Sequence, residues 1–541
     1  MKLPMILRPV LIVLSIAVSA SASAGVPVPA SPNLIPEAGP HAVGLRVIQQ
    51  YDYGRLLEPS VDAFGKAGTA APGRPIQMLV WYPARRGGGA PMLAADYQQA
   101  SLNDVDFTAS AAEATRQRAG WMAGPQSAQY GAPTLAVRDA AAAAGRFPVV
   151  IYAPSFAAQA HENIDLCEYL ASHGYVVLAS RSLGARSVMM TDDVEGVEAQ
   201  AVDIAFLANY AQTLPQADIG NVASAGFSWG GMANVFAAAR SSRIKALVSL
   251  DGSIRYHPKV WGAAGYVQAA RTAVPMLFLG ARAPSAEAME RDDKLGRSYL
   301  NTMTYSDVYV ATLPPMTHPD FSAWHVRFAD DAAFGDYARA DVLQAYRSGA
   351  LYVRRFLDAY LKQDREALAW LKQSPARHGI GPQVMSMAFT PARHELLGEG
   401  DFLRAFSKAG YQDAQSIHAG MVARSPGFKL SPLSMNTLGY QLLRAKNARG
   451  ALELFKLATF LEPEYANAFD SEGEAYEALG DTKLAIAAYE KAVAADPNQR
   501  NAVARIAALP ARRNGLVAFS APRCDGTVGR PSRRAASTAS R

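Results

Sequence analysis

Ser228 lies at the centre of a Gly-x-Ser-x-Gly sequence, Gly226 to Gly230, and is the residue of this chain best placed to act as a nucleophile. Residues 218–225 before it are short and strand-like, and residues 231–240 after it are small, apolar and helix-forming. Flanking glycines permit a sharp strand-to-helix turn that exposes the serine hydroxyl above a sheet. The context therefore predicts a nucleophilic serine rather than an ordinary Gly/Ser turn.

A serine hydroxyl is a weak nucleophile, so it needs a general base that is oriented by a carboxylate. In a strand–serine–helix arrangement the expected chain order is serine, acid, histidine. The chain has nine histidines, and His318 follows the last predicted strand, residues 307–313. His325 falls in the helix expected next. His257 comes too soon after the strand that ends on the predicted acid, Asp251. We predict that His318 is the base.

Asp251 is the predicted orienting acid because it ends the strand expected over residues 244–250. The following strand, residues 274–279, has no carboxylate in the first turn after it. Glu287 and Asp292 are more distant alternatives, and Asp251 could also be a plain turn residue. The predicted triad is therefore Ser228, His318 and Asp251.

Two backbone N–H groups are expected to bind the developing oxyanion. One is predicted from Trp229, directly after the serine, and the other from Phe156, in the loop after the apolar strand 147–153. The side chains of Phe156, Trp229 and Phe321 could line an apolar substrate pocket or simply pack in the core. The sequence leaves these two alternatives open.

Residues 40–378 alternate strand and helix patterns, which predicts an α/β fold with a mostly parallel sheet and helices on both faces. Strands are expected over residues 43–49, 76–82, 147–153, 175–180, 218–225, 244–250, 274–279 and 307–313, and helices over 164–173, 197–212 and 342–361. Residues 84–146 form an insertion, either a cap over the pocket or surface decoration.

The C-terminal part changes character and contains an internal repeat with a period of 34 residues, typical of packed helical hairpins. The matched positions are Gly439 with Gly473, Ala451 with Ala485, Phe455 with Tyr489, Ala458 with Ala492, and Pro463 with Pro497. Residues 431–508 resemble two tetratricopeptide repeats, which implies an all-α domain able to bind a protein partner. Residues 379–430 are predicted to be linker helices.

The two ends of the chain have their own character. Residues 1–24 combine Lys2 and Arg8, a short apolar run and the small-residue site Ala22-Ser23-Ala24, which predicts a signal peptide and a periplasmic or secreted protein. No later apolar stretch is long enough to predict a transmembrane segment.

Residues 509–541 hold seven arginines and one aspartate, which together account for the whole net charge of +6. They are predicted to be a disordered basic tail.

Because the tail carries that charge, the folded body is not basic and nucleic acid is not expected as a partner. No His-x-x-x-His or Cys-x-x-Cys pair predicts a metal site, and no Gly-x-x-x-x-Gly-Lys-Ser/Thr sequence predicts a phosphate loop. We expect no cofactor. Cys167 and Cys524 are expected to be unpaired.

Residues 40–370 resemble the α/β-hydrolases of the dienelactone hydrolase-like group, and within it the platelet-activating factor acetylhydrolase type. The stretches that carry the resemblance are residues 80–83, 170–175, 226–231, 250–251 and 318–321. It implies a calcium-independent serine esterase whose substrates are phospholipids with short or oxidised acyl chains, or other small esters. The chain departs from the family at Pro154-Ser155, where His-Gly is common.

We therefore expect an exported hydrolase that cleaves carboxylic esters through an acyl-enzyme. A peptidase or amidase would use the same triad. A catalytically inert scaffold that binds partners through the repeats is an alternative of a different class, although an inert domain usually lacks a triad member.

Overall fold

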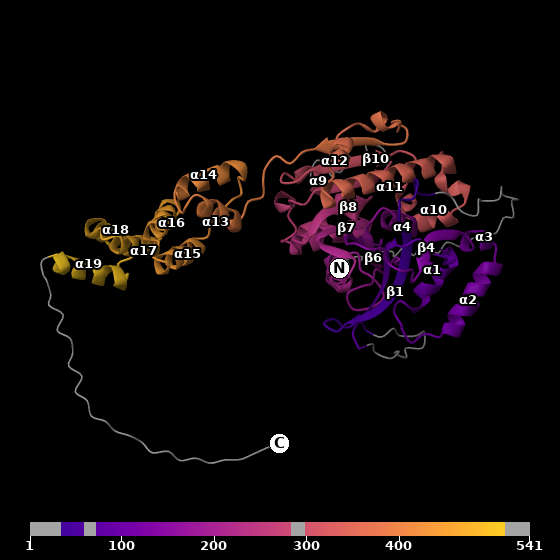
Figure 1. Ribbon diagram of the computed structural model, residues 1–541, viewed down its shortest axis with the longest axis horizontal. Coiled ribbons are helices and arrows are strands. Elements are labelled where there is room, and N and C mark those ends of the chain that lie inside the picture. The colour runs from indigo at the N-terminus through magenta and orange to yellow at the C-terminus, as the bar shows by residue number, and fades with distance from the viewer. Residues whose placement is uncertain (1–33, 59–71, 283–297, 514–541) are drawn as a thin grey trace, which may run out of the picture. The chain divides into compact units, whose positions relative to one another are not determined.

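The computed structural model describes residues 34–58, 72–282 and 298–513 (Figure 1). The chain divides into two compact units, one up to Arg393 and one from His394 onward. The predicted signal peptide, the alternative acids Glu287 and Asp292, and residues 514–541 of the predicted tail lie outside the described residues.

The first unit is built on one sheet of eleven strands. Its order is β11-β10-β9-β8-β7-β5-β6-β2-β1-β4-β3. The strands are β1 Ala42–Asp52, β2 Arg74–Ala84, β3 Pro91–Leu93, β4 Pro133–Arg138, β5 Phe147–Ala153, β6 Val176–Ser180, β7 Ala217–Phe227, β8 Ile244–Leu250, β9 Met276–Ala281, β10 Val308–Leu313 and β11 Ser386–Thr390.

The helices of this unit connect the strands and cover the sheet. They are α1 Ala94–Ala100, α2 Ala111–Ala123, α3 Ser127–Tyr130, α4 Ile164–Ser172, α5 Val194–Tyr210, α6 Trp229–Arg240, α7 Pro258–Ala263, α9 Tyr299–Thr302, α10 Ala323–Phe328, α11 Arg339–Leu361 and α12 Arg365–Leu371.

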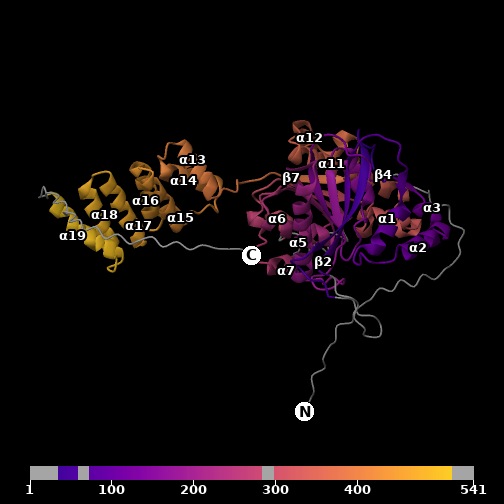
Figure 2. The same ribbon diagram turned by 60° about the horizontal axis from the view of Figure 1, so that its bottom comes forward.

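The run from β6 to β10 is parallel, and β2 is antiparallel to its neighbours β1 and β6. Apolar side chains of α4 and α11 pack on one face of the sheet, and those of α5 and α6 pack on the other. In Figure 2, α11 lies on the opposite side of the sheet from α5 and α6. Every residue of β2 is buried, because helices cover both faces. The first unit therefore has a mostly parallel sheet with helices on both faces, the α/β fold that the alternating pattern predicts.

The insertion, residues 84–146, adds strands to the sheet and packs a helix against the rest of the unit. Its strands β3 and β4 extend the sheet beyond β1, where β4 pairs parallel to β1. Its helix α3 packs the Tyr130 ring against Trp324 and Phe328 of α10, with ring centroids 6.4 and 4.7 Å apart. The insertion is therefore partly a continuation of the sheet, which its Ala- and Gln-rich sequence did not predict.

The sheet also continues past the boundary expected at residue 378. Residues 386–390 form β11, which pairs antiparallel with β10 at the sheet edge. The expectation that residues 379–430 are all linker helices is wrong for this segment, because a five-residue edge strand has too little periodicity to be recognised in sequence. The rest of the range contains helices, α13 Glu399–Lys408 and α14 Ala414–Arg424.

In the residues that the structure describes, the second unit is built from helices alone. Its helices are α13 Glu399–Lys408, α14 Ala414–Arg424, α15 Pro432–Arg444, α16 Ala448–Leu461, α17 Ala466–Ala478, α18 Thr482–Ala495 and α19 Arg500–Arg513. Helix α19 extends past residue 509, where the tail was expected to begin. The 34-residue period places Gly439 of α15 against Phe455 of α16, and Gly473 of α17 against Tyr489 of α18.

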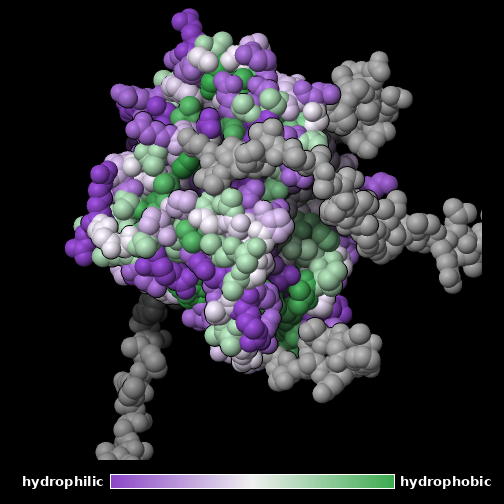
Figure 3. Space-filling model, turned by 90° about the vertical axis from the view of Figure 1, so that its right-hand side faces the viewer, coloured by the Kyte–Doolittle hydropathy of each residue, from purple (hydrophilic) through white to green (hydrophobic). Residues whose placement is uncertain are grey.

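No helix in the described ranges is long and apolar enough to cross a membrane. Figure 3 shows one face of the first unit, on which hydrophilic and hydrophobic side chains are interspersed.

The close approach at Gly473 gives a prediction for the stability of the second unit. A Cβ there would lie 2.5 Å from Cε1 of Tyr489. We therefore expect Gly473→Ala to lower the free energy of unfolding of this unit by about 1–3 kcal/mol, as overpacking does. Urea denaturation of the full chain, followed by helical circular dichroism, measures it.

Gly420 of α14 is the matched control, because no atom lies within 4 Å of a Cβ placed there. Gly420→Ala should raise the stability by about 0.5–1 kcal/mol through helix propensity. Equal effects of the two substitutions would contradict the packing explanation.

Candidate active site

Ser228 occupies the turn between β7 and α6 in a backbone conformation that L-residues rarely adopt. Its φ is 53° and its ψ is −115°. Such a conformation costs about 1–3 kcal/mol and persists only where the surroundings hold it. Here the Ser228 N–H donates to the Leu250 carbonyl at 3.0 Å, and the Ser228 carbonyl accepts from the N–H groups of Gly231 (3.0 Å) and Ser253 (2.8 Å).

The two glycines that flank Ser228 are required by the close packing of backbone around the turn. A Cβ on Gly226 would lie 2.5 Å from the Gly230 carbonyl oxygen, and a Cβ on Gly230 would lie 2.6 Å from the Pro154 carbonyl oxygen. Any larger residue would force β5, β7 and α6 apart. The chain therefore makes the sharp strand-to-helix turn that the sequence context predicts, and the Ser228 hydroxyl lies above the edge of the sheet.

The structure brings Ser228, His318 and Asp251 together. His318 Nε2 lies 2.9 Å from Ser228 Oγ, and His318 Nδ1 lies 2.6 Å from Asp251 Oδ2. Asp251 follows β8, and His318 follows β10 across the carboxyl edge of the sheet. The arrangement is serine, imidazole and carboxylate in hydrogen-bonded series, which can pass a proton from the hydroxyl to the ring.

Asp251 is 3% exposed, yet its remaining oxygen is fully used. Oδ1 accepts from the Tyr256 hydroxyl at 2.9 Å and from the Ala281 N–H at 3.1 Å. Burial without such donors would be costly for a carboxylate. These contacts fix the carboxylate plane towards His318, whose side chain is 48% exposed at the mouth of the site.

The competing histidines lie elsewhere. His325 Nε2 is 3.7 Å from Asp320 Oδ1, and burial lowers the pKa of His325 below its ordinary value. His257 packs its ring against Trp229, with centroids 5.9 Å apart. His318 alone is in hydrogen-bonded series with the serine and a buried carboxylate among the three histidines considered.

Backbone donors face the same edge from the loop after β5. In this loop the N–H groups of Ser155, Ala157 and Ala158 are used: they donate to Glu162 Oε2 (2.9 Å), Met190 Sδ (3.0 Å) and the Ser155 carbonyl (3.2 Å). The Phe156 N–H has no acceptor among the described residues. Ala157 has a φ of 57°, which shapes the loop around that free donor.

Trp229 supplies the second free donor. It is the first residue of α6, and the first N–H groups of a helix have no partner within it. Among the described residues, the N–H groups predicted at Phe156 and Trp229 have no acceptor, so both are available to donate to a bound ligand.

The side chains predicted to line a pocket divide into two groups. Phe156 is 42% exposed, and its ring meets Trp229 edge to face at 5.7 Å. Trp229 and Phe321 are 4% and 3% exposed, and Phe321 stacks on Phe227 with centroids 6.3 Å apart. Trp229 and Phe321 are therefore packed in the core. Of the three side chains, only Phe156 is exposed enough to contact a ligand.

Glu162 was not predicted from the sequence. It is a buried carboxylate whose Oε1 accepts from the Ser155 hydroxyl at 2.5 Å. Burial is the largest influence on it and raises its pKa to about 7, against the lowering effect of the Ser155 and Tyr152 donors and of His318. No spacing rule marks this residue, because its position depends on how the loop after β5 folds back.

Among the residues that the structure describes, no group of three or more His, Cys, Asp or Glu side chains could hold a metal ion.

Comparison with known proteins adds a sequence relationship. Residues 115–256 match a family model described as chlorophyllase, a segment that includes Ser228 and Asp251 and ends before His318. A search of curated proteins finds no match. Among solved structures the chain is similar to a ferulic acid esterase from Streptomyces cinnamoneus at 20% identity, with a TM-score of 0.46, over 66% of this chain and 98% of that one.

The raised pKa of Glu162 gives a prediction for stability against pH. The folded state holds the proton up to about pH 7, whereas the unfolded chain releases it near 4.5, so the stabilisation is complete below about pH 4.5 and is lost as pH rises through 7. Glu162→Gln should remove that loss, so its stability relative to wild type should rise by up to about 3 kcal/mol across the window.

Denaturant titrations between pH 4.5 and 8 measure this difference. Glu366→Gln, at an exposed site in α12, is the control for replacing a glutamate by glutamine. A difference for Glu162→Gln that does not change with pH would show that the Glu162 carboxyl is not held protonated.

Proposed function

We propose that this protein is a serine hydrolase that cleaves carboxylic esters through an acyl-enzyme. The observation that carries the proposal is the series Asp251 Oδ2–His318 Nδ1 at 2.6 Å and His318 Nε2–Ser228 Oγ at 2.9 Å. The strained turn at Ser228 supports it further, since such strain is typical of functional sites. The match to the chlorophyllase family model supports ester chemistry at this general level.

In the first half-reaction Ser228 Oγ attacks the ester carbonyl carbon while its proton passes to His318 Nε2. Asp251 stabilises the imidazolium that forms and keeps the ring oriented. The carbonyl oxygen becomes an oxyanion that accepts from the N–H groups of Phe156 and Trp229. Each such donor is typically worth about 3–4 kcal/mol of transition-state stabilisation.

Collapse of this intermediate breaks the bond to the leaving oxygen, which takes the proton from His318 and departs as the alcohol. Water then attacks the acyl-enzyme, and His318 accepts its proton. A second oxyanion forms and collapses, the proton returns to Ser228 Oγ, and the carboxylic acid leaves. The exposed edge of His318 leaves room for the alcohol and for water.

We further propose that the substrates are small esters or lipid esters with a short acyl chain. The resemblance to the platelet-activating factor acetylhydrolase type motivates this, and the partly exposed Phe156 ring beside the free donors supplies apolar surface for an acyl group. The signal-like residues 1–24 motivate export to the periplasm or beyond. The 34-residue period motivates a tetratricopeptide role for α15–α18 in binding a protein.

Hydrolysis of p-nitrophenyl esters, from acetate to octanoate, tests the proposed activity. Ser228→Ala and His318→Ala should each lower kcat/KM by about 10⁴-fold or more, because members of a triad act as a unit. The chain-length profile of the wild type measures the acyl site.

His325→Ala is the matched control, since this half-buried histidine lies seven residues from His318 but pairs with Asp320. It should retain activity. Ester hydrolysis that survives Ser228→Ala would contradict the assignment, and turnover of p-nitroanilides in preference to esters would favour an amidase. A folded wild type inert on both would favour the scaffold role.

Tyr256 tests the role of Asp251. Tyr256→Phe deletes one of the two donors to Asp251 Oδ1 and leaves the Ala281 N–H. Since a hydrogen bond to a charged group is worth about 1.5–3 kcal/mol, part of the orienting energy is lost, and we expect kcat to fall by roughly tenfold with little change in KM.

Tyr266→Phe is the control, because the Tyr266 hydroxyl donates to Glu198 at 2.6 Å outside the triad. Equal kcat values for the two variants would contradict an orienting role for Tyr256.

A further inference from the structure

Helix α5 carries two buried polar side chains one turn apart, Gln200 and Asp203, each 3% exposed. Gln200 Nε2 donates to the Pro154 carbonyl at 2.7 Å and to the Ser182 hydroxyl at 2.6 Å. Pro154 begins the loop that carries Phe156. A side chain on a helix therefore holds the start of the loop whose N–H is proposed to bind the oxyanion.

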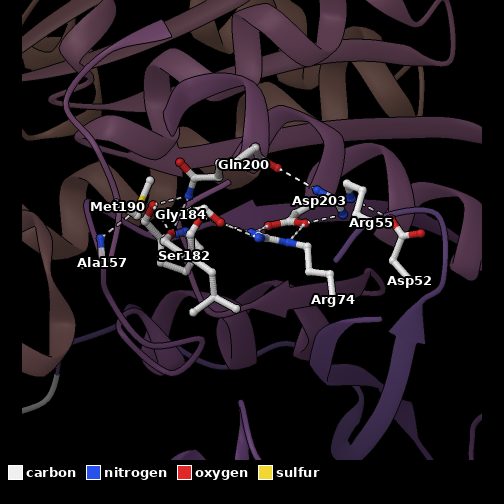
Figure 4. A network of polar contacts seen from close by, with 12 residues as sticks. Asp52, Arg55, Arg74, Ala157, Ser182, Gly184, Met190, Gln200 and Asp203 are labelled. Carbon is white, nitrogen blue, oxygen red and sulfur yellow. Dashed lines mark hydrogen bonds and ion pairs between the residues drawn. The ribbon is translucent and has the colours of Figure 1, made fainter. Parts of the chain in front are cut away.

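Asp203, the second buried polar residue of α5, pairs with Arg74, an arginine with no exposed surface. Arg74 makes a two-pronged ion pair with Asp203, with Nε–Oδ1 and Nη2–Oδ2 distances of 2.9 and 2.6 Å. The same guanidinium donates to the carbonyls of Leu183, at 3.0 Å, and Gly184. Figure 4 shows Asp203, Arg74, Gly184, Ser182 and Gln200 next to one another in this network.

Ser182 directly precedes Leu183 and Gly184, whose carbonyls Arg74 holds, and it contacts the loop after β5 at two points. Its hydroxyl donates to the Pro154 carbonyl at 3.2 Å, and its N–H donates to the Ala158 carbonyl at 3.0 Å. These contacts bracket Phe156 on both sides. Met190 Sδ accepts from the Ala157 N–H within the bracket, where the backbone is in the left-handed region.

We propose that Gln200 is a positioning residue for the Phe156 N–H, anchored through Ser182 by the buried Arg74–Asp203 pair. The inference rests on the proposed function. A donor stabilises an oxyanion only when it already lies at hydrogen-bonding distance from it, because reorganisation during the reaction would cost the energy gained. An arginine paired and hydrogen-bonded in the interior moves little, and it lies too deep to contact the substrate itself.

The test compares two buried glutamines that make the same kind of bond. Gln200→Leu removes the donor to Pro154, whereas Gln77→Leu removes a donor to the Ala100 carbonyl, at 2.8 Å, beneath the insertion. Gln77 is 5% exposed, so both substitutions replace a buried amide by an apolar group. Each full-length variant is assayed for kcat and KM on p-nitrophenyl acetate and for amide hydrogen exchange of a peptide spanning residues 154–158.

We expect Gln200→Leu to lower kcat by about tenfold with KM within twofold of wild type, and to speed exchange of the loop peptide. Gln77→Leu should change neither. A purely structural role for Gln200 would lower the melting temperature of both variants alike and leave the kcat of both in place. If Gln200→Leu does not fold, Ser182→Ala, which deletes one hydroxyl, replaces it. This variant should lower kcat by about threefold, leave KM unchanged and speed exchange of the loop peptide.

Two failures are distinguishable. If the wild type hydrolyses esters and Gln200→Leu keeps kcat within twofold, the positioning inference is overturned and the proposed function stands. If the wild type hydrolyses no ester, the proposed function is overturned. Amide hydrogen exchange of the 154–158 peptide is then the test of whether Gln200 positions the loop. Equal exchange in Gln200→Leu and Gln77→Leu then overturns the positioning as well, whereas faster exchange in Gln200→Leu alone supports it.

Discussion

The arrangement of this site depends on the strained turn at Ser228. A non-glycine residue at a φ of 53° is unfavourable in isolation, so the surrounding structure must hold it. The holding groups come from β8 and the turn after it, through the Leu250 carbonyl and the Ser253 N–H. The same segment carries Asp251, itself at a φ of 40°. Nucleophile and acid are thus fixed by one set of backbone hydrogen bonds.

Burial of charge is the second constraint. Asp251 and Arg74 are both removed from solvent, and each is surrounded by partners that compensate for lost hydration. Glu162 is buried with neutral donors around it and has no ion pair among the described residues, and burial raises its pKa to about 7. The interior behind the loop after β5 is therefore polar, whereas His318 and Phe156 are exposed to solvent.

Much of the fold follows from local pattern. Apolar strands alternating with helices predict the parallel run from β5 to β10, because strands buried on both faces read as continuous apolar stretches. The strands β3, β4 and β11 were missed. β3 and β11 are short strands at the two edges of the sheet, and β4, between β3 and β1, has six residues with little apolar alternation. The 34-residue period likewise indicates which helices of the second unit meet, because the small residues Gly439 and Gly473 face large rings.

The sequence by itself determined the Ser228 turn, the order serine, acid, histidine, and which three residues to consider, because each lies at the end of a strand that can be read locally. Only the tertiary structure decided that the Phe156 N–H has no acceptor among the described residues, that Trp229 and Phe321 are packed, and that Glu162, Tyr256 and Gln200 reach this edge of the sheet. Their partners lie on separate elements, joined only by folding, and a hydrogen bond across such distances in sequence leaves no periodic signal along the chain.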